Sequence, residues 1–293
     1  MSDYPRPQGH SGAHPQRGTH GRLVLITGAT SGIGAAYARL LAAQGHDLWL
    51  TGRRMAVLEP LAESLREAHG VHVTTWSVEL GDAEALAELE SAVRAVPDLF
   101  GLINNAGYSD DGIFHLMSPG QHRAVMRVHM DATVQLAHAA LPALKQHDGF
   151  MINVASLASW LPTAGSPLYG PTKGFVRLFT ETLAITYHDT GVRFQVLCPG
   201  FVVTDFHSRI GLDPEKFYKS HGLTRAFPAS WVVQRSMRDL HRGRVISSPG
   251  LHYRTLGLLI RLMPRPVLYR LLRFGMSRRY NIKGQMDAQR DRG

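Results

Sequence analysis

Three residues of this chain have types and a spacing suited to moving a proton, namely Ser156, Tyr169 and Lys173. Lys173 follows Tyr169 by four positions, so on a helix the phenol and the ammonium share one face. A tyrosine has an unperturbed pKa of about 10, and a nearby cation favours the phenolate. We therefore expect Lys173 to lower the pKa of Tyr169 towards general acid–base work. Ser156 follows the apolar run 150–154, where its hydroxyl could hydrogen-bond a substrate oxygen. The alternative is a surface tyrosine and an unrelated lysine on an ordinary helix.

A glycine-rich turn precedes these residues and could position a phosphate. The apolar run 22–27 leads directly into it, and apolar residues at helical spacing follow. Glycines between a strand and a helix let the backbone approach a phosphate at the positive end of the helix. The sequence therefore predicts a dinucleotide site here, with the binding residues Thr27, Gly28, Thr30, Ser31, Gly32, Ile33 and Gly34.

The end of the second predicted strand, 47–51, indicates which dinucleotide is preferred. Folds that bind NAD usually carry an acidic residue there, which hydrogen-bonds the ribose 2′-hydroxyl. This chain has Arg53 and Arg54 instead, which suits the 2′-phosphate of NADP(H). The alternative is a solvated basic helix start, and we favour NADP(H) over NAD(H).

Composition limits the class of protein. The chain has 293 residues and a single cysteine, Cys198, so an internal disulfide is excluded and a reducing, cytoplasmic setting fits. Residues 1–20 are rich in Gly, Pro and His and are expected to be a disordered tail. A formal charge of +9 would suit nucleic-acid binding only if the basic residues formed one stripe. The basic residues are scattered over the domain, so nucleic acid is not an expected partner. The histidines show no metal-ligand spacing, and no metal is expected.

Strand-like and helical segments alternate along the chain, which predicts a parallel, doubly wound sheet. Pro60 falls inside the predicted helix 55–68 and is expected to mark a late start of that helix. No boundary is visible before about residue 250, so we expect one catalytic domain over 21–250 and a separate extension over 251–293. Further strands are expected at 71–76, 99–104, 150–154, 192–197 and 244–247, and further helices at 82–95, 118–146, 169–189 and 229–241.

Several motifs in this order resemble the short-chain dehydrogenase/reductase family over roughly 23–250. They are Thr27-Gly28-x-x-x-Gly32-x-Gly34, Asn104-Asn105-Ala106-Gly107, Ser156, Tyr169-x-x-x-Lys173 and Pro199-Gly200-x-x-x-Thr204. The resemblance implies an α/β Rossmann fold with a seven-stranded parallel sheet, and hydride transfer between a nicotinamide and a carbonyl or alcohol carbon. It implies that Tyr169 is the acid/base, that Lys173 lowers its pKa and holds the ribose, and that Ser156 orients the substrate oxygen. Further cofactor contacts implied are Glu79, Leu80, Asn105, Ala106, Gly107, Pro199, Gly200, Val202 and Thr204.

One residue departs from the family pattern. His129 stands where the family usually carries an asparagine that bends its helix and helps to hold a relay water. Imidazole can donate and accept hydrogen bonds and titrates near neutrality, so it could preserve the relay and add a pH dependence. The alternative is that His129 fills space in a helix kink, and both interpretations stay open here.

The loop 201–227 is expected to form a lid with an apolar inner face over the substrate, and Trp160, Leu161 and Tyr108 are expected near the mouth. These residues favour a hydrophobic ketone, steroid-like or acyl-like substrate. Cys198 is expected to be a buried small hydrophobe rather than a nucleophile.

Beyond residue 250, leucines alternate with arginines, and no acidic residue lies between Arg242 and Lys283. We expect two short amphipathic helices broken at Pro264 and Pro266. Docking on the chain's own domain or on a partner subunit is favoured, peripheral contact with an anionic membrane comes second, and nucleic acid third.

The sequence therefore favours an NADP(H)-dependent reductase or dehydrogenase for a small-molecule substrate. Members of the family commonly assemble through the helices that carry His129 and Tyr169, so the resemblance implies a homodimer or homotetramer. The alternative function is a non-catalytic nucleotide-binding module with an interaction or regulatory role. Intact Ser156, Tyr169 and Lys173 argue against that alternative.

Overall fold

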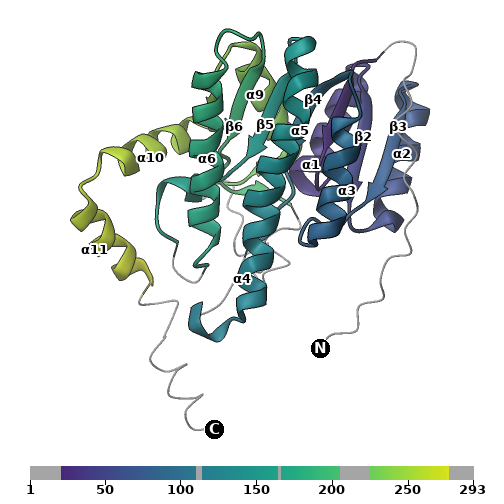
Figure 1. Ribbon diagram of the computed structural model, residues 1–293. Helices are drawn as coiled ribbons and strands as arrows, with labels where there is room; N and C mark the ends of the chain where they lie inside the picture. The colour runs from purple at the N-terminus through teal and green to yellow at the C-terminus, as the bar shows by residue number, and fades with distance from the viewer. Residues whose placement is uncertain (1–20, 110–113, 164–165, 205–224, 277–293) are drawn as a thin grey trace.

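A seven-stranded parallel β-sheet lies at the centre of the protein. The computed structural model describes residues 21–109, 114–163, 166–204 and 225–276, so the predicted tail and most of the predicted substrate loop lie outside the described residues. The strand order β3-β2-β1-β4-β5-β6-β9 reverses between β1 and β4 (Figure 1), and the predicted doubly wound fold is confirmed. The strands are β1 Leu23–Ile26, β2 Asp47–Gly52, β3 Val73–Ser77, β4 Leu99–Asn104, β5 Phe150–Val154, β6 Arg193–Leu197 and β9 Ile246–Ser247.

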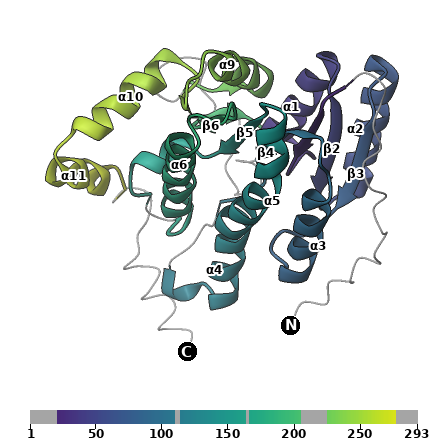
Figure 2. The same ribbon diagram turned by 45° about the horizontal axis from the view of Figure 1, so that its top comes forward.

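Two layers of helices cover the sheet, one on each face (Figure 2). The strands β1, β2, β4 and β5 bury every residue, which explains their continuous apolar runs. Helices α1, α2 and α9 pack on one face, and α3, α5 and α6 pack on the other. Their bounds, with that of α4, are α1 Gly32–Ala43, α2 Met55–His69, α3 Ala83–Arg94, α4 Pro119–Met126, α5 Ala132–Gln146, α6 Tyr169–Thr186 and α9 Ala229–His241.

Two expectations about helices need correction. Helix α2 begins at Met55, so the prediction that Pro60 marks a late start was wrong. Pro60 lacks the N–H that would donate to the carbonyl of Ala56, and Ala56 is exposed to water. The helix continues through Pro60 because Leu58 and Leu61, on either side of the proline in sequence, are buried in the core. The predicted helix 118–146 is divided by a π-helical turn at Arg127–Asp131, which contains His129.

The C-terminal extension forms the two expected helices, α10 Leu251–Leu262 and α11 Arg265–Met276, and the break falls at the prolines. They project from the side of the domain next to α6 (Figure 1). Among the described residues, no helix combines the length and apolar character that crossing a bilayer requires.

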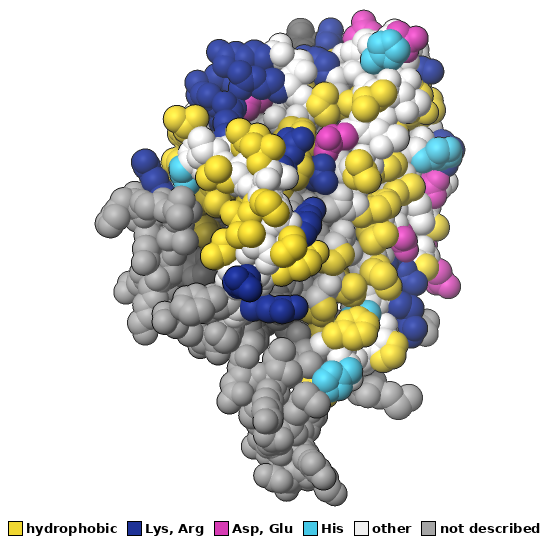
Figure 3. Space-filling view, turned by 90° about the vertical axis from the view of Figure 1, so that its left-hand side faces the viewer, with side chains coloured by type: hydrophobic (Ala, Val, Ile, Leu, Met, Phe, Trp, Pro, Cys, Tyr) yellow, Lys and Arg dark blue, Asp and Glu magenta, His cyan; other side chains and the backbone are white. Residues whose placement is uncertain are grey.

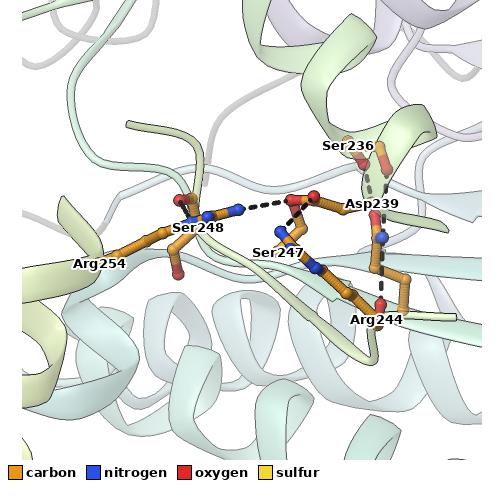
Figure 4. Close-up of polar contacts among 7 residues, drawn as sticks. Ser236, Asp239, Arg244, Ser247, Ser248 and Arg254 are labelled. Carbon is orange, nitrogen blue, oxygen red and sulfur yellow. Dashed lines mark hydrogen bonds and ion pairs between the residues drawn. The ribbon is translucent and has the colours of Figure 1, made fainter. Parts of the chain in front are cut away.

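The extension is fastened by a buried carboxylate, that of Asp239 on α9 (Figure 4). Asp239 accepts hydrogen bonds from Arg244 Nη1 at 2.9 Å, Ser247 Oγ at 2.9 Å and Arg254 Nη2 at 3.1 Å. Arg254 belongs to α10, and its Nε also donates to the carbonyl of Ser248 at 3.2 Å. A buried charge needs such partners, so this cluster fixes the first turn of α10 against the sheet edge.

Candidate active site

A cavity of about 690 Å³ opens at the carboxyl ends of the central strands. It lies where the strand order reverses, which is the usual ligand position in open α/β sheets. Nearly all of the residues predicted to bind cofactor or to act on substrate line it. The exceptions are Thr27, Gly34 and His129, which lie behind the wall and support it.

The glycine turn between β1 and α1 has the backbone that the motif predicts. Gly28 and Gly32 have φ of 67° and 58°, a region that favours glycine, and both residues line the cavity. A Cβ on Gly34 would lie 2.4 Å from the carbonyl oxygen of Gly28, so only glycine fits where α1 meets the turn. Thr30, Ser31 and Ile33 also face the cavity, and the first turn of α1 carries no acidic side chain. This end of the helix can therefore receive an anion.

A second turn, which follows β4, is tied to the glycine turn. Thr27 Oγ1 accepts hydrogen bonds from the backbone N–H groups of Asn105 and Ala106, each at 3.0 Å. Asn105 Nδ2 donates to the carbonyls of Thr27 at 3.0 Å and Gly28 at 3.1 Å. Thr27 therefore acts by holding two cavity-lining turns together rather than by facing a ligand.

The polar end of the cavity lies beyond β2. Arg54 Nη2 donates to Thr30 Oγ1 at 3.3 Å, and Arg53 Nη1 pairs with Glu79 Oε2 at 3.1 Å. Both arginines are exposed, so they can turn towards a ligand at small cost in packing. Glu79 and Leu80 line the cavity next to them, as predicted. This end can recognise an anionic group attached to a ribose.

The wall opposite the glycine turn is the segment after β6. Pro199, Gly200, Val202 and Thr204 line the cavity, as predicted. The methyl group of Thr204 lies 3.0 Å from where a Cβ on Gly32 would be, so this segment closes over the glycine turn. The predicted lid beyond Thr204 lies outside the described residues.

Ser156, Tyr169 and Lys173 come together at the other end of the cavity. Ser156 follows β5 and caps a 3₁₀ turn, with its Oγ accepting the N–H of Ala158 at 3.1 Å. Tyr169 begins α6, and Lys173 lies one turn later. Lys173 Nζ donates to the carbonyl of Val154 at 2.9 Å, which holds the ammonium at the end of β5.

The pKa of Tyr169 departs from the sequence expectation. Burial raises it, and the hydrogen bond with Ser156 opposes that rise. The net shift is therefore upward, opposite to the direction predicted from the spacing of Tyr169 and Lys173, because burial has the largest effect. Burial also lowers the pKa of Lys173 to about 8, so its positive charge is incomplete above neutrality. Tyr169 is therefore a neutral proton donor in this geometry.

His129 forms a bridge behind the cavity wall. Its Nε2 accepts the backbone N–H of Tyr108 at 3.1 Å, so the neutral ring carries its proton on Nδ1. Nδ1 then donates to Thr172 Oγ1 at 2.8 Å, and the Thr172 hydroxyl donates to the carbonyl of Leu168 at 2.7 Å. The ring therefore connects the loop after β4 with the turn of α6 that carries Lys173.

The expected titration of His129 near neutrality needs correction. Burial, and then the positive charge of Lys173, lower the pKa of His129 well below its usual value. Gly107 makes this close contact possible, because a Cβ there would lie 3.0 Å from His129 Nε2 and 3.2 Å from Lys173 Nζ. The imidazole is therefore neutral at physiological pH and adds no charge to the site.

The remaining wall of the cavity is mainly apolar. Tyr108, Leu157, Leu161 and Phe201 line it, together with the hydroxyls of Ser109 and Ser166, which lie 3.2 Å apart, and Ala158 and Thr163. Tyr108 and Leu161 were predicted near the mouth, whereas the two serines lie in loops that no sequence pattern singled out.

Two other sequence predictions have clear outcomes. Trp160 does not line the cavity, and the guanidinium carbons of Arg177 and Arg261 lie over its ring, 3.8 Å and 4.8 Å from the ring centre. Cys198 is fully buried, and burial raises the pKa of its thiol to about 12, so it is a small hydrophobe as predicted. Thr172 was missed because nothing in the sequence distinguishes a bridging threonine from any other helical threonine.

These features fit a nicotinamide dinucleotide. The glycine turn and the α1 N-terminus can take the pyrophosphate, and Arg53 with Arg54 can take the ribose of the adenosine end. Asn105 to Gly107 and Lys173 would then face the nicotinamide end, next to Tyr169. The donors and the apolar wall therefore lie where such a molecule and a second, carbon-based reactant could meet.

Comparison with known proteins agrees with this geometry. Residues 22–215 match the short chain dehydrogenase family. A sulfoacetaldehyde reductase from Chromohalobacter salexigens is 36% identical over 198 residues, which is 62% of this chain and 73% of that protein. An NADP-dependent 3-hydroxy acid dehydrogenase from Salmonella typhi is 34% identical over 218 residues, which is 72% of this chain and 86% of that protein.

Solved structures extend the likeness over more of the chain. A short-chain dehydrogenase from Sphingobium yanoikuyae in complex with NADPH superposes with a TM-score of 0.74 and 28% identity, over 88% of this chain and 96% of that one. A bulky-bulky ketone specific alcohol dehydrogenase from Comamonas testosteroni gives a TM-score of 0.70 and 25% identity, over 90% and 96%.

Proposed function

This chain belongs to the short-chain dehydrogenase/reductase family and is an oxidoreductase that acts with a nicotinamide cofactor on hydroxyl or carbonyl groups. From that premise we propose that it is an NADP(H)-dependent carbonyl reductase for bulky, hydrophobic ketones. Alcohol oxidation is the reverse reaction. The observation that carries the proposal is one cavity with arginines at the adenosine end and Tyr169 and Ser156 beside an apolar wall at the other.

The proposed chemistry divides between three side chains. The bound nicotinamide supplies or accepts the hydride. Ser156 holds the carbonyl oxygen, and Tyr169 donates its phenolic proton to that oxygen as negative charge develops there. Lys173 stabilises the phenolate that remains, since its ammonium is held on the same helix face by the carbonyl of Val154. His129 positions the Tyr108 loop and the Thr172 turn rather than carrying a proton.

The preference for NADP(H) is supported by the end of β2. Arg53 and Arg54 stand where an acidic residue would bind the 2′-hydroxyl of NAD, and Thr30 lies within hydrogen-bond distance of Arg54. The NADPH complex of the Sphingobium yanoikuyae dehydrogenase and the NADP dependence of the Salmonella typhi relative point the same way.

The preference for an apolar substrate is supported by the charges around the reacting end. Among the described residues that line the cavity there, Lys173 is the only cation, and it already donates to Val154. A sulfonate or carboxylate, such as the names of the two sequence relatives indicate for their substrates, would lack a further positive partner. The apolar wall of Tyr108, Leu161 and Phe201 suits a bulky ketone better, as in the Comamonas testosteroni dehydrogenase.

The test is a spectrophotometric assay of NADPH consumption with ketones and acyl thioesters of increasing chain length. We expect kcat/KM to rise with apolar size, and the Tyr169→Phe variant to lose turnover by at least about a hundredfold while still binding NADPH. Undiminished turnover in Tyr169→Phe would refute the assigned acid, and higher kcat/KM for small anionic substrates would refute the substrate class.

The proposal includes the setting of the enzyme. We place it in the cytoplasm, with residues 21–250 as the catalytic domain and 251–293 as an extension, and as a homodimer or homotetramer through α4, α5 and α6. Leu178 and Ile185 on α6 support an oligomer, because they are 61% and 75% exposed in the single chain. Analytical ultracentrifugation of the full chain would give the mass that decides it.

A further inference from the structure

The outer face of the extension is apolar, although its inner face is fixed to the domain. On α10, Tyr253, Gly257 and Ile260 are buried, and at 100° per residue they share one side of the helix. Leu251, Leu258 and Leu262 lie on the opposite side and are 76%, 54% and 72% exposed. Leu259 on α10 is also exposed, as are Val267 and Leu271, which share one side of α11.

Arginines border this face, which we call the extension face. Figure 3 shows hydrophobic side chains gathered on the α10–α11 side of the molecule with Lys and Arg side chains beside them. Arg254 and Arg261 belong to α10, and Arg265, Arg270 and Arg273 belong to α11. The sequence has no Asp or Glu from residue 242 to residue 286, so no acidic residue within the extension helices neutralises them.

Two of these arginines are already engaged in the fold. Arg254 pairs with the buried Asp239, and Arg261 lies over the ring of Trp160. Arg265, Arg270 and Arg273 are exposed. The extension therefore combines a helix α10 that is fixed on its inner side, an apolar outer side of that helix, and three exposed cations on α11, which together form an amphipathic surface.

We propose that the extension face binds the surface of a membrane rich in anionic lipids. Leucines can enter the boundary between headgroups and acyl chains while the flanking guanidinium groups meet lipid phosphates, which is the arrangement of interfacial amphipathic helices. Contact with a second copy through the same face is disfavoured, because an isologous contact pairs the patch with itself and the patch has no acidic residue to meet its arginines. Nucleic acid would offer phosphates but nothing to cover the leucines.

The position of the face gives the contact a use, which rests on the proposed function. Helix α10 packs on the turn Leu157–Trp160, and Tyr253 fills the space above Gly200. Tyr253 Oη also accepts the N–H of Phe201 at 3.0 Å. Leu157, Gly200 and Phe201 line the apolar end of the cavity, so a bound membrane would lie close to the place where a lipid-soluble ketone must enter.

The test is co-sedimentation of the full chain with vesicles, measured without cofactor or substrate so that it is independent of catalysis. Vesicles of phosphatidylcholine alone are compared with vesicles containing phosphatidylglycerol, at low and high salt. We expect binding to the anionic vesicles only, weakened by salt. Binding to neither kind, or equal binding to both at all salt concentrations, would overturn the proposal.

Matched variants locate the contact. Changing Arg265, Arg270 and Arg273 to glutamine should weaken binding to anionic vesicles on the order of a hundredfold, since each basic residue contributes about fivefold. The control changes the exposed Arg39, Arg238 and Arg242 to glutamine, which removes the same charge elsewhere and should have little effect. Equal loss in both triple variants would mean that net charge alone drives binding, and would refute the extension face as the contact.

An apolar variant and a mass measurement complete the experiment. Changing Leu258, Leu259 and Leu262 to serine removes exposed side chains only, so the fold should survive while vesicle binding falls at least tenfold. Sedimentation velocity on the same variant should show an unchanged mass. A loss of oligomer with unchanged vesicle binding would assign this face to a second copy and overturn the membrane proposal.

Discussion

Replacing His129 by leucine tests the bridge between the Tyr108 loop and the Thr172 turn. Leucine is of similar size, so it removes two polar contacts without opening a large space. The partly buried N–H of Tyr108 loses its acceptor, at about 1–2 kcal/mol, and the Thr172 hydroxyl loses a donor, at about 0.5–1.5 kcal/mol. We expect the free energy of unfolding to fall by about 2–3 kcal/mol at pH 7.5, and Tm by roughly 5–10 °C.

The pH dependence of this loss separates the bridge from simple packing. The pKa of His129 is lowered well below 6.5 by burial and by Lys173, so below pH 6.5 the unfolded chain takes up a proton that the folded chain refuses. The wild-type protein therefore loses about 1.4 kcal/mol of stability as the pH falls from 7.5 to 5.5, whereas the leucine variant has no such loss from this position. Between pH 7.5 and pH 5.5 the stability gap should narrow by about 1.4 kcal/mol.

The assay is urea denaturation at the two pH values, with His138→Leu, an exposed site on α5, as the matched control. Other histidines with lowered pKa, such as His46 and His252, contribute equally to both proteins and cancel in the difference. The neutral, bridging imidazole would be refuted if the difference in unfolding free energy between wild type and His129→Leu stayed constant from pH 7.5 to pH 5.5. It would also be refuted if that difference were no larger than the one between wild type and His138→Leu.

Kinetics of His129→Asn then address the role of the bridge in turnover. Asparagine is shorter and can keep only one of the two contacts, but it restores the residue that the family usually carries at this position. We expect it to be less destabilising than leucine and to retain or raise turnover, because the imidazole positions the site and carries no proton in our proposal. A collapse of kcat in a folded Asn variant would show that the histidine has a dedicated chemical role.

Three further predictions concern residues around the same cavity and the extension. Arg53→Ala should raise KM for NADPH roughly tenfold to a hundredfold and leave KM for NADH nearly unchanged, and equal loss for both cofactors would contradict the 2′-phosphate contact. Gly34→Ala should abolish cofactor binding in a fluorescence titration, because its Cβ would lie 2.4 Å from the carbonyl oxygen of Gly28, and normal affinity would show that the turn can relax. Asp239→Asn should destabilise the protein by about 3 kcal/mol in urea denaturation, since an amide places an N–H group against donors of Arg244 and Arg254, and an unchanged midpoint would mean that the cluster adds nothing.

The sequence predicted those parts of the site that depend on local backbone rules. The tight glycine turn from Gly28 to Gly34 and the helix that brings Tyr169 and Lys173 to one face both follow from short stretches of chain. Each of them could be inferred because the residue type and its spacing are the cause of the geometry.

The sequence did not predict features that depend on which distant segments meet. Thr172 has a role only because the π turn brings His129 against α6, and the contact of Trp160 with Arg261 depends on where the extension packs. The direction of the Tyr169 pKa shift was also missed, because spacing along a helix says nothing about burial, and here burial raises the pKa.

The extension and the substrate side of the cavity are coupled through one hydroxyl. Tyr253 Oη donates to the carbonyl of Arg225 at 2.6 Å and accepts the N–H of Phe201 at 3.0 Å, so it joins the two ends of the predicted substrate loop. The short parallel pair β7–β8, Val202–Val203 with Phe227–Pro228, joins the same two ends through the backbone. Helix α10 is therefore in direct contact with both described ends of the loop and not only with a distant surface. Tyr253 itself does not line the cavity, but it contacts Gly200 and Phe201, which do, so helix α10 supports the substrate side of the wall from behind.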